Sequence, residues 1–345
     1  KKKLMIFLTA TILTFSLVLK DQDVSQIFSV AAKVKKQYIL FAVLAMSIYI
    51  LGEAVNITRI LKELGEKSKL ISNIRYTLIG FFFSAITPAA SGGQPMEIYY
   101  MHKDDISVAN STLALLMQLC SLQIVTITVG TISAVIHFEV LKSGLIYLLI
   151  LGIILNSSAL MLLIIAIFSK RLSEGLIKFV VKLLKFFRIP NVEKKQEKLE
   201  KELESYQTSA KYIKEHKILM LKTVITTVVQ MIAYYSVPYW IYLAFGLTEY
   251  NIFEILTLQA VLYATVSGIP SPGAVGVSEG GFLGIFRNVF PETIISSAML
   301  LTRGANFYLF IIISAIIVMI STFREKRIEK KQIQETEVLT EKSEK

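Results

Sequence analysis

Four ionisable residues lie within apolar stretches of the sequence, where a charge is costly and therefore informative. They are Glu53, Glu97, Glu279 and Arg303. Each should cost about 3 kcal/mol at the centre of a bilayer, so each needs a partner or a watery cavity. We predict an ion pair between Glu279 and Arg303, which could be structural or functional. Glu53 is the weaker candidate because its position also suits the membrane interface.

Two clusters of proline and glycine interrupt apolar stretches, at residues 87–97 and 269–281. The aligned pairs are Pro88 with Pro272 and Gly92 with Gly276, and a glutamate, Glu97 or Glu279, follows within a few residues. A single proline would equally well kink an ordinary membrane-spanning helix. Two aligned clusters instead indicate a weak internal repeat.

Irregular backbone at membrane depth survives only against protein or water, because lipid tails cannot bond its amides and carbonyls. The N-termini of half-helices can then present their amides to an anionic group. We therefore predict a binding site for an anionic lipid headgroup at the two breaks. Its residues are Pro88, Gly92, Gly93, Glu97, Pro270, Pro272, Gly273, Gly276, Glu279 and Arg303.

Residue types that support other chemistry are scarce. Cys120 is the single cysteine, and His102, His137 and His216 lie far apart, so we expect neither a disulfide framework nor a metal or haem site. The phosphate-binding pattern Gly-x-x-x-x-Gly-Lys does not occur. No cofactor is expected, catalysis is not favoured, and uphill transport would need an ion gradient.

The composition is that of a membrane protein: 54% of the 345 residues are hydrophobic, and the mean hydropathy is +0.59. A spanning helix needs about 20 apolar residues. Apolar stretches occupy approximately residues 4–19, 38–57, 74–90, 107–136, 144–168, 218–245, 253–269 and 293–320. The first of these is interpreted as an uncleaved span, since no small-residue cleavage site follows it.

The net charge of +11 comes largely from lysines at the ends of apolar stretches, which membrane topology explains without nucleic acid. Both termini and the basic block 169–217 are predicted to be cytoplasmic. Three apolar stretches, an odd number, lie between this block and the C-terminal tail, so one of them, 253–287, is predicted not to cross. Basic residues on both sides of 74–90 predict the same for that stretch. We predict an all-α polytopic membrane protein with about six transmembrane helices and two opposed re-entrant helical hairpins, arranged as an inverted repeat.

The sequence suggests one membrane domain, residues 1–323, followed by a cytoplasmic tail, 324–345, that is predicted to be disordered. Within the domain, 169–217 is predicted to be a basic amphipathic segment at the cytoplasmic surface. Gly152, in an ordinary span, is expected to tolerate a large side chain better than Gly276, where a close backbone approach is expected.

Two runs carry a family resemblance: FFFSAITP at 81–88 with Gly92-Gly93-Gln94-Pro95, and the more specific PGAVGVSE at 272–279. Together they resemble the flippase-like transmembrane domain of lysylphosphatidylglycerol synthases, from about Leu4 to Phe323. In full-length synthases a soluble C-terminal domain transfers lysine from lysyl-tRNA to phosphatidylglycerol, and the membrane domain is held to move the product between leaflets. Because this chain ends soon after its last span, the resemblance implies lipid movement more than synthesis.

Three functions remain open. The first is a lipid translocase of the cell membrane that moves a phospholipid, an aminoacyl-phospholipid or a polyprenyl-phosphate lipid. The second is a phosphatidylglycerol lysyltransferase, and the third is a membrane scaffold for a separate soluble enzyme. The expected partners are membrane lipids with anionic headgroups, and a second copy of the chain or a soluble enzyme is a further possibility. No nucleic-acid partner is expected.

Overall fold

The apolar stretches fold into helices in the computed structural model, which describes residues 29, 32–87, 90–136, 145–171, 174–175, 178, 181–182, 192–269, 274 and 276–323. All regular structure in these residues is helical. The first half contains α3 (Lys36–Glu63), α4 (Leu70–Ile86), α5 (Gly93–Lys103), α6 (Val108–Ile136) and α8 (Leu145–Phe168). The second half contains α10 (Val192–Glu215), α11 (Lys217–Tyr235), α12 (Val237–Ala244), α13 (Ile252–Val266), α14 (Val277–Ile285) and α15 (Ile295–Arg303). A π-helical turn, Gly304–Tyr308, follows α15, and the helix continues to Phe323.

Five of these helical stretches are long and apolar enough to cross a membrane. They are Lys36–Glu63, Val108–Ile136, Ile146–Phe168, Lys217–Ala244 and Ile295–Phe323. Each coincides with one of the six predicted crossings; the remaining one, 4–19, lies outside the described residues, as does the tail after Phe323. The two apolar stretches that were predicted not to cross form the shorter helices α4 and α13. The protein is therefore an all-helical membrane protein with several spans.

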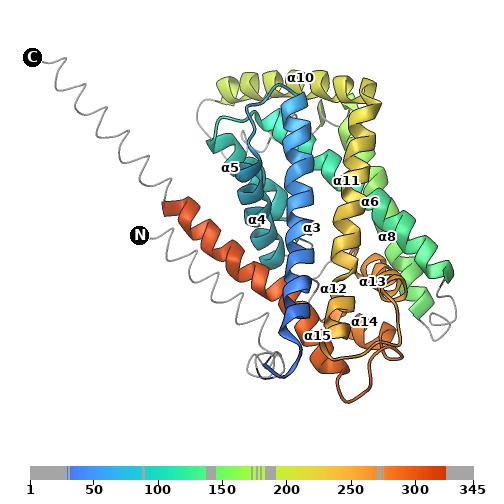
Figure 1. Cartoon of the computed structure of the whole chain (residues 1–345). Helices are drawn as coiled ribbons and strands as arrows, with labels where there is room; N and C mark the ends of the chain where they lie inside the picture. Colours follow the sequence, from blue (N-terminus) through green and yellow to red (C-terminus); the bar gives the residue numbers. More distant parts are fainter. Residues whose placement is uncertain are drawn as a thin grey trace, which may run out of the picture.

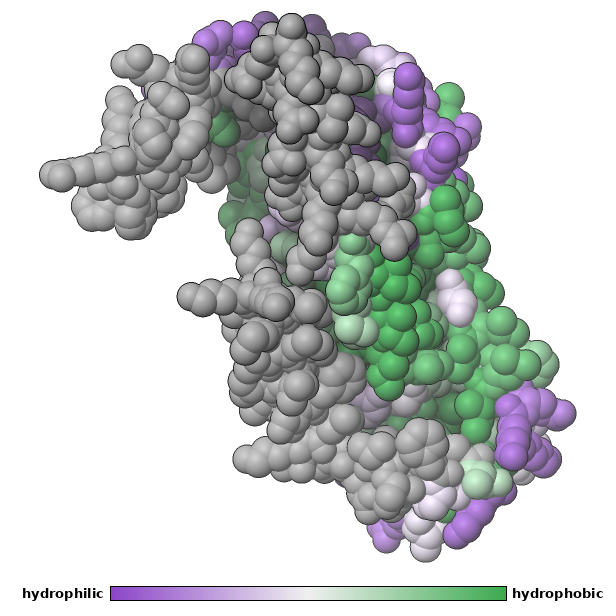
Figure 2. Space-filling model, turned by 90° about the vertical axis from the view of Figure 1, so that its left-hand side faces the viewer, coloured by the Kyte–Doolittle hydropathy of each residue, from purple (hydrophilic) through white to green (hydrophobic). Residues whose placement is uncertain are grey.

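Helix α10 lies across one end of the bundle, whereas α12, α13 and α14 lie toward the other end (Figure 1). The long helices α3 and α11 run side by side between these ends. Figure 2 shows an apolar band on one face, with hydrophilic residues toward both ends. Large apolar side chains are exposed along the spans, such as Val135 and Leu162. Such a surface suits surrounding lipid rather than water.

The two breaks in the helices share a backbone feature in the same register. Ala90 and Ala274 both have φ of +53°, a conformation in which alanine is uncommon. The interval of 184 residues between them also separates Gly93 from Val277, where α5 and α14 begin. The order α3, α4, break, α5, α6 is matched by α11–α12, α13, break, α14, α15. The weak sequence alignment of the two clusters thus has a structural counterpart.

A buried amide links three of the long helices. Asn56 on α3 donates to Gln118 Oε1 on α6 at 2.9 Å and to Thr227 Oγ1 on α11 at 3.0 Å. Its own Oδ1 accepts from Arg59 Nη1 at 2.9 Å. Because lipid and apolar packing offer no alternative partners, these hydrogen bonds fix the register of α3 against α6 and α11.

Candidate functional site

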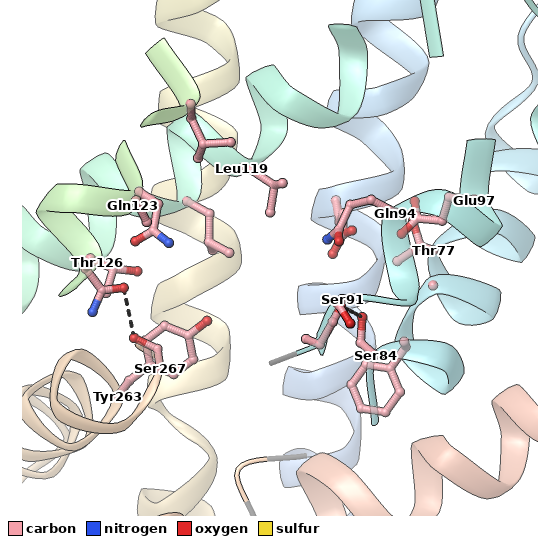
Figure 3. A pocket seen from close by; sticks show the side chains of 18 of the residues that line it. Thr77, Ser84, Ser91, Gln94, Glu97, Leu119, Gln123, Thr126, Tyr263 and Ser267 are labelled. Atoms are coloured by element: carbon pink, nitrogen blue, oxygen red, sulfur yellow. Dashed lines mark hydrogen bonds between the residues drawn. The ribbon is translucent and has the colours of Figure 1, made fainter. Parts of the chain in front are cut away.

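A cavity of about 620 Å³ lies between α3, α4, α5, α6, α8 and α13. Figure 3 shows polar side chains facing each other across it, with Gln94 and Glu97 on one side and Gln123, Thr126 and Ser267 on the other. Apart from α5, these elements are membrane-length helices or the shorter apolar helices α4 and α13. The cavity therefore brings polar groups together at a depth where lipid offers them no partner.

The upstream break forms one wall of this cavity. Thr87 Oγ1 donates to Phe83 O at 2.7 Å and accepts from the Gly92 amide at 2.9 Å, which ties the end of α4 to the start of α5. Gly93 packs directly on Ser84, where a Cβ would overlap the serine hydroxyl. Gly92 and Gly93 thus allow the chain to reverse tightly after α4, and α5 then runs beside α4.

The Glu97 side chain packs against α4 at Gly80, where the absence of a side chain leaves room for it. A Cβ at Gly80 would collide with the Glu97 carboxylate, and its distance to Glu97 Cγ would be 2.8 Å. Glu97 is only 3% exposed, and its Oε2 has no hydrogen-bond partner among the described residues. A carboxylate that is buried and only partly satisfied is expensive to keep, which marks it as a functional candidate.

Glu53, the weaker candidate that was not among the predicted site residues, lies in the same cavity. It lines the cavity together with Glu97 and interacts with it electrostatically. The signal was available in the sequence, since Glu53 lies ten residues before the end of α3, or about 15 Å along a helix. What the sequence could not supply was the partner, because Glu97 is on a different helix.

A second cavity of about 290 Å³ adjoins the first, and both are lined by Tyr49, Phe81, Ser84 and Tyr263. Its other side reaches the downstream break, where Ala274, Ser278 and Arg303 line it. Tyrosine rings stand at the junction: Tyr234 lies 5.3 Å from both Tyr49 and Tyr263, measured between ring centroids. The two cavities together extend from one break to the other.

The predicted ion pair between Glu279 and Arg303 is present. Arg303 Nε donates to Glu279 Oε1 at 2.9 Å, and the two side chains are 10% and 8% exposed. The Arg303 guanidinium also lies 4.0 Å from the centroid of the Phe307 ring. Phe307 belongs to the π-helical turn that follows Arg303; such turns are frequent at functional sites.

Gly276 is required for its backbone conformation and not for a close approach. Its φ is +82°, and a Cβ added there would meet nothing within 4 Å. Its amide donates to Glu279 Oε2 at 2.6 Å, so this amide is already occupied at the start of α14. The expected close approach at Gly276 was wrong, and the glycine is selected by the left-handed φ instead.

The expectation that Gly152 would tolerate a large side chain was also wrong, because Gly152 lies at a tight helix crossing. A Cβ there would overlap Ala264 O and lie 2.8 Å from Thr265 Cα, both in α13. Asn156, one turn further along α8, donates to Ala264 O at 3.2 Å. The sequence showed an apolar helix but could not show which of its faces carries a neighbour.

The structure distributes the predicted site residues between two walls. Gly92, Gly93 and Glu97 form the upstream wall, and Gly276, Glu279 and Arg303 lie at the downstream break. The predicted residues Pro88, Pro270, Pro272 and Gly273 lie outside the described residues. The polar residues Tyr49, Thr77 and Tyr263 line the cavities but carry no sequence signal of their own. Within the described chain, no cluster of histidine, cysteine and acidic residues could hold a metal ion.

Membrane-length helices, two breaks in matching register and a cavity lined by both polar and apolar side chains define a polytopic α-helical membrane protein. The chain belongs to the family described as the lysylphosphatidylglycerol synthase TM region, which it matches over residues 3–314. The family resemblance of the two motifs is thereby confirmed. A comparison with curated proteins found no match.

Proposed function

We propose that the protein moves a lipid between the two leaflets of the cell membrane. The observation that carries this proposal is the pair of adjoining cavities that joins the upstream break to the downstream break. Polar and charged groups line this space, whereas the outer surface of the helices is apolar. A headgroup could occupy the polar space while its acyl or polyprenyl chains remain in the surrounding lipid.

The proposed topology has six crossings and two re-entrant hairpins, α4–α5 and α13–α14, in an inverted repeat. The lengths of α4 and α13, 17 and 15 residues, give helices of about 26 and 22 Å, shorter than a hydrocarbon core of roughly 30 Å. The hairpins lie toward opposite ends of the bundle in Figure 1. In this proposal α10 and both termini are cytoplasmic, following the positive-inside rule.

The downstream wall suits the phosphate of a phospholipid, an aminoacyl-phospholipid or a polyprenyl-phosphate. Arg303 lines the smaller cavity and carries five N–H donors, of which Nε is bonded to Glu279. Asn306 lines the same cavity. Rocking of one half against the other would expose such a site to each leaflet in turn.

Reconstitution into vesicles tests the proposal. The purified protein should accelerate the movement of labelled phosphatidylglycerol, aminoacylated phosphatidylglycerol or a polyprenyl phosphate, measured by the access of a membrane-impermeant quencher to the label. Glu279→Gln should slow this movement, whereas Glu292→Gln at an exposed site should not. Unaccelerated movement of all three lipid classes would refute the proposal. As a separate measurement, mass spectrometry of co-purified lipid would identify the lipid that the cavity holds.

The family description favours a second candidate, phosphatidylglycerol lysyltransferase, although the match is to the membrane region. Membranes that contain the protein, lysyl-tRNA and phosphatidylglycerol separate the two candidates. Formation of lysyl-phosphatidylglycerol above the level of protein-free membranes would establish the transferase. Lipid movement without formation of this product would support translocation alone.

A further inference from the structure

The larger cavity carries two carboxylates, and its described lining contains no basic side chain. Glu53 from α3 and Glu97 from α5 both line it, and their carboxylates interact electrostatically. Among the described residues of its lining there is no lysine, arginine or histidine. Arg303 lines the smaller cavity and is bonded to Glu279. The negative charge of the larger cavity is therefore not neutralised from within its own wall.

Three buried polar atoms of this lining lack partners within the described chain: Glu97 Oε2, Thr77 Oγ1 and Gln123 Oε1. Glu97 and Thr77 are 3% and 2% exposed. Thr77 comes from α4 and is no part of the acidic pair, so its orphaned hydroxyl is an independent observation. An unsatisfied buried polar atom costs about 1–3 kcal/mol. Three of them around one cavity indicate that a bound species completes the wall.

We propose that Glu53 and Glu97 form a proton-binding site that holds one proton, and that this proton accompanies the movement of lipid. The inference rests on the proposed function. Two carboxylates that share a buried site cannot both remain ionised, because each repels the charge of the other. One bound proton leaves the pair with a single negative charge and so removes this repulsion. The step is a reversible transfer: hydronium gives its proton to a carboxylate and leaves water.

The described groups around the pair are uncharged or are bonded to another charge. The tyrosines that face it, Tyr49 from α3 and Tyr263 from α13, interact with Glu53 but are phenols that stay neutral at physiological pH. Helices α4, α6 and α8 contribute uncharged polar groups to the lining: Thr77, Gln123, Thr126 and Asn156. From α11, Tyr234 and Tyr235 stand behind Tyr49 and Tyr263; from α15, Arg303 is bonded to Glu279.

Infrared difference spectroscopy of the protein in lipid nanodiscs measures the proton directly. The wild type should show a protonated carboxyl band that disappears on raising the pH. Glu53→Gln and Glu97→Gln should each abolish this band, because the remaining carboxylate no longer faces a like charge. The control Glu292→Gln should leave it unchanged. A wild type without the band, or a band that persists in both variants, would overturn the proposal.

Gly80→Ala tests the geometry without removing an acid. The added methyl group overlaps the Glu97 carboxylate, so it should push that group away from its seat and shift or abolish the band. Gly280→Ala is the matched control, because a Cβ there meets nothing within 4 Å and no positive φ is involved. A band that is identical in Gly80→Ala and the wild type would show that the seat on α4 does not position the proton.

Lipid movement under an imposed pH gradient separates this inference from the proposed function. If one proton accompanies each lipid, a gradient of one pH unit should bias the lipid distribution by up to about tenfold, and Glu97→Gln should remove that bias. A pH-dependent carboxyl band in a protein that moves no lipid would refute the proposed function and leave the proton-binding site standing. Lipid movement that ignores the gradient, in a protein without the band, would overturn the inference and leave the proposed function standing.

Discussion

At the scale of single residues, Glu279 holds two partners at once, the Arg303 guanidinium and the Gly276 amide. Glu279→Gln removes the charge and keeps the shape, which leaves Arg303 uncompensated in a site that is 8% exposed. Loss of one member of a buried pair costs about 3–5 kcal/mol, so the midpoint of thermal unfolding in detergent should fall.

The double variant Glu279→Gln with Arg303→Gln should recover part of that loss, because no unpaired charge is left. The same set of variants separates a structural pair from a functional one. If lipid movement recovers along with stability, the pair is structural. If stability recovers and lipid movement does not, the charges contact the lipid or a proton.

Gly276 provides a second prediction at this scale. Because its φ is +82° and space is open around its Cβ, Gly276→Ala and Gly276→Leu should be destabilising by similar amounts, about 1–2 kcal/mol each. Chemical denaturation of the detergent-solubilised variants measures both values. A much larger effect of leucine than of alanine would mean that the side chain meets a neighbour there after all.

At the scale of elements, the crossing of α8 and α13 depends on Gly152. Gly152→Leu forces a large side chain against the backbone of Ala264 and Thr265. Overpacking of this kind costs about 1–3 kcal/mol, and more where backbone must move. The thermal unfolding midpoint should therefore drop in Gly152→Leu and change little in Gly280→Leu, since Gly280 is exposed. Equal midpoints would show that α8 and α13 are not in close contact in the membrane.

At the scale of the whole molecule, the proposed topology predicts which residues can be labelled from each side of the membrane. In a Cys120→Ala background, Lys201→Cys on α10 should react only with permeant maleimide in intact cells. Glu249→Cys, in the exposed loop between α12 and α13, should react with an impermeant reagent. Labelling of position 201 from outside the cell would show that α10 is external and would refute the proposed topology.

Much of this arrangement was readable from the chain alone. The apolar stretches predicted the five described spans and the two short helices, because hydrophobic length is a local property that the bilayer enforces directly. The proline and glycine clusters marked both breaks, since helices cannot continue through them unaided. The Glu279–Arg303 pair was also predictable, because a buried charge requires an opposite charge and few were available.

Tertiary structure decided which surfaces meet. Glu53 and Glu97 share a cavity only because Gly80 lets α5 lie close to α4, and no local pattern in the sequence encodes that approach. Gly152 became a contact point and Gly276 did not, which reverses the expectation from sequence. Helix length and the cost of a buried charge are properties of the segment itself. The partner of a side chain depends on the rotation and crossing of helices that lie far apart in the chain.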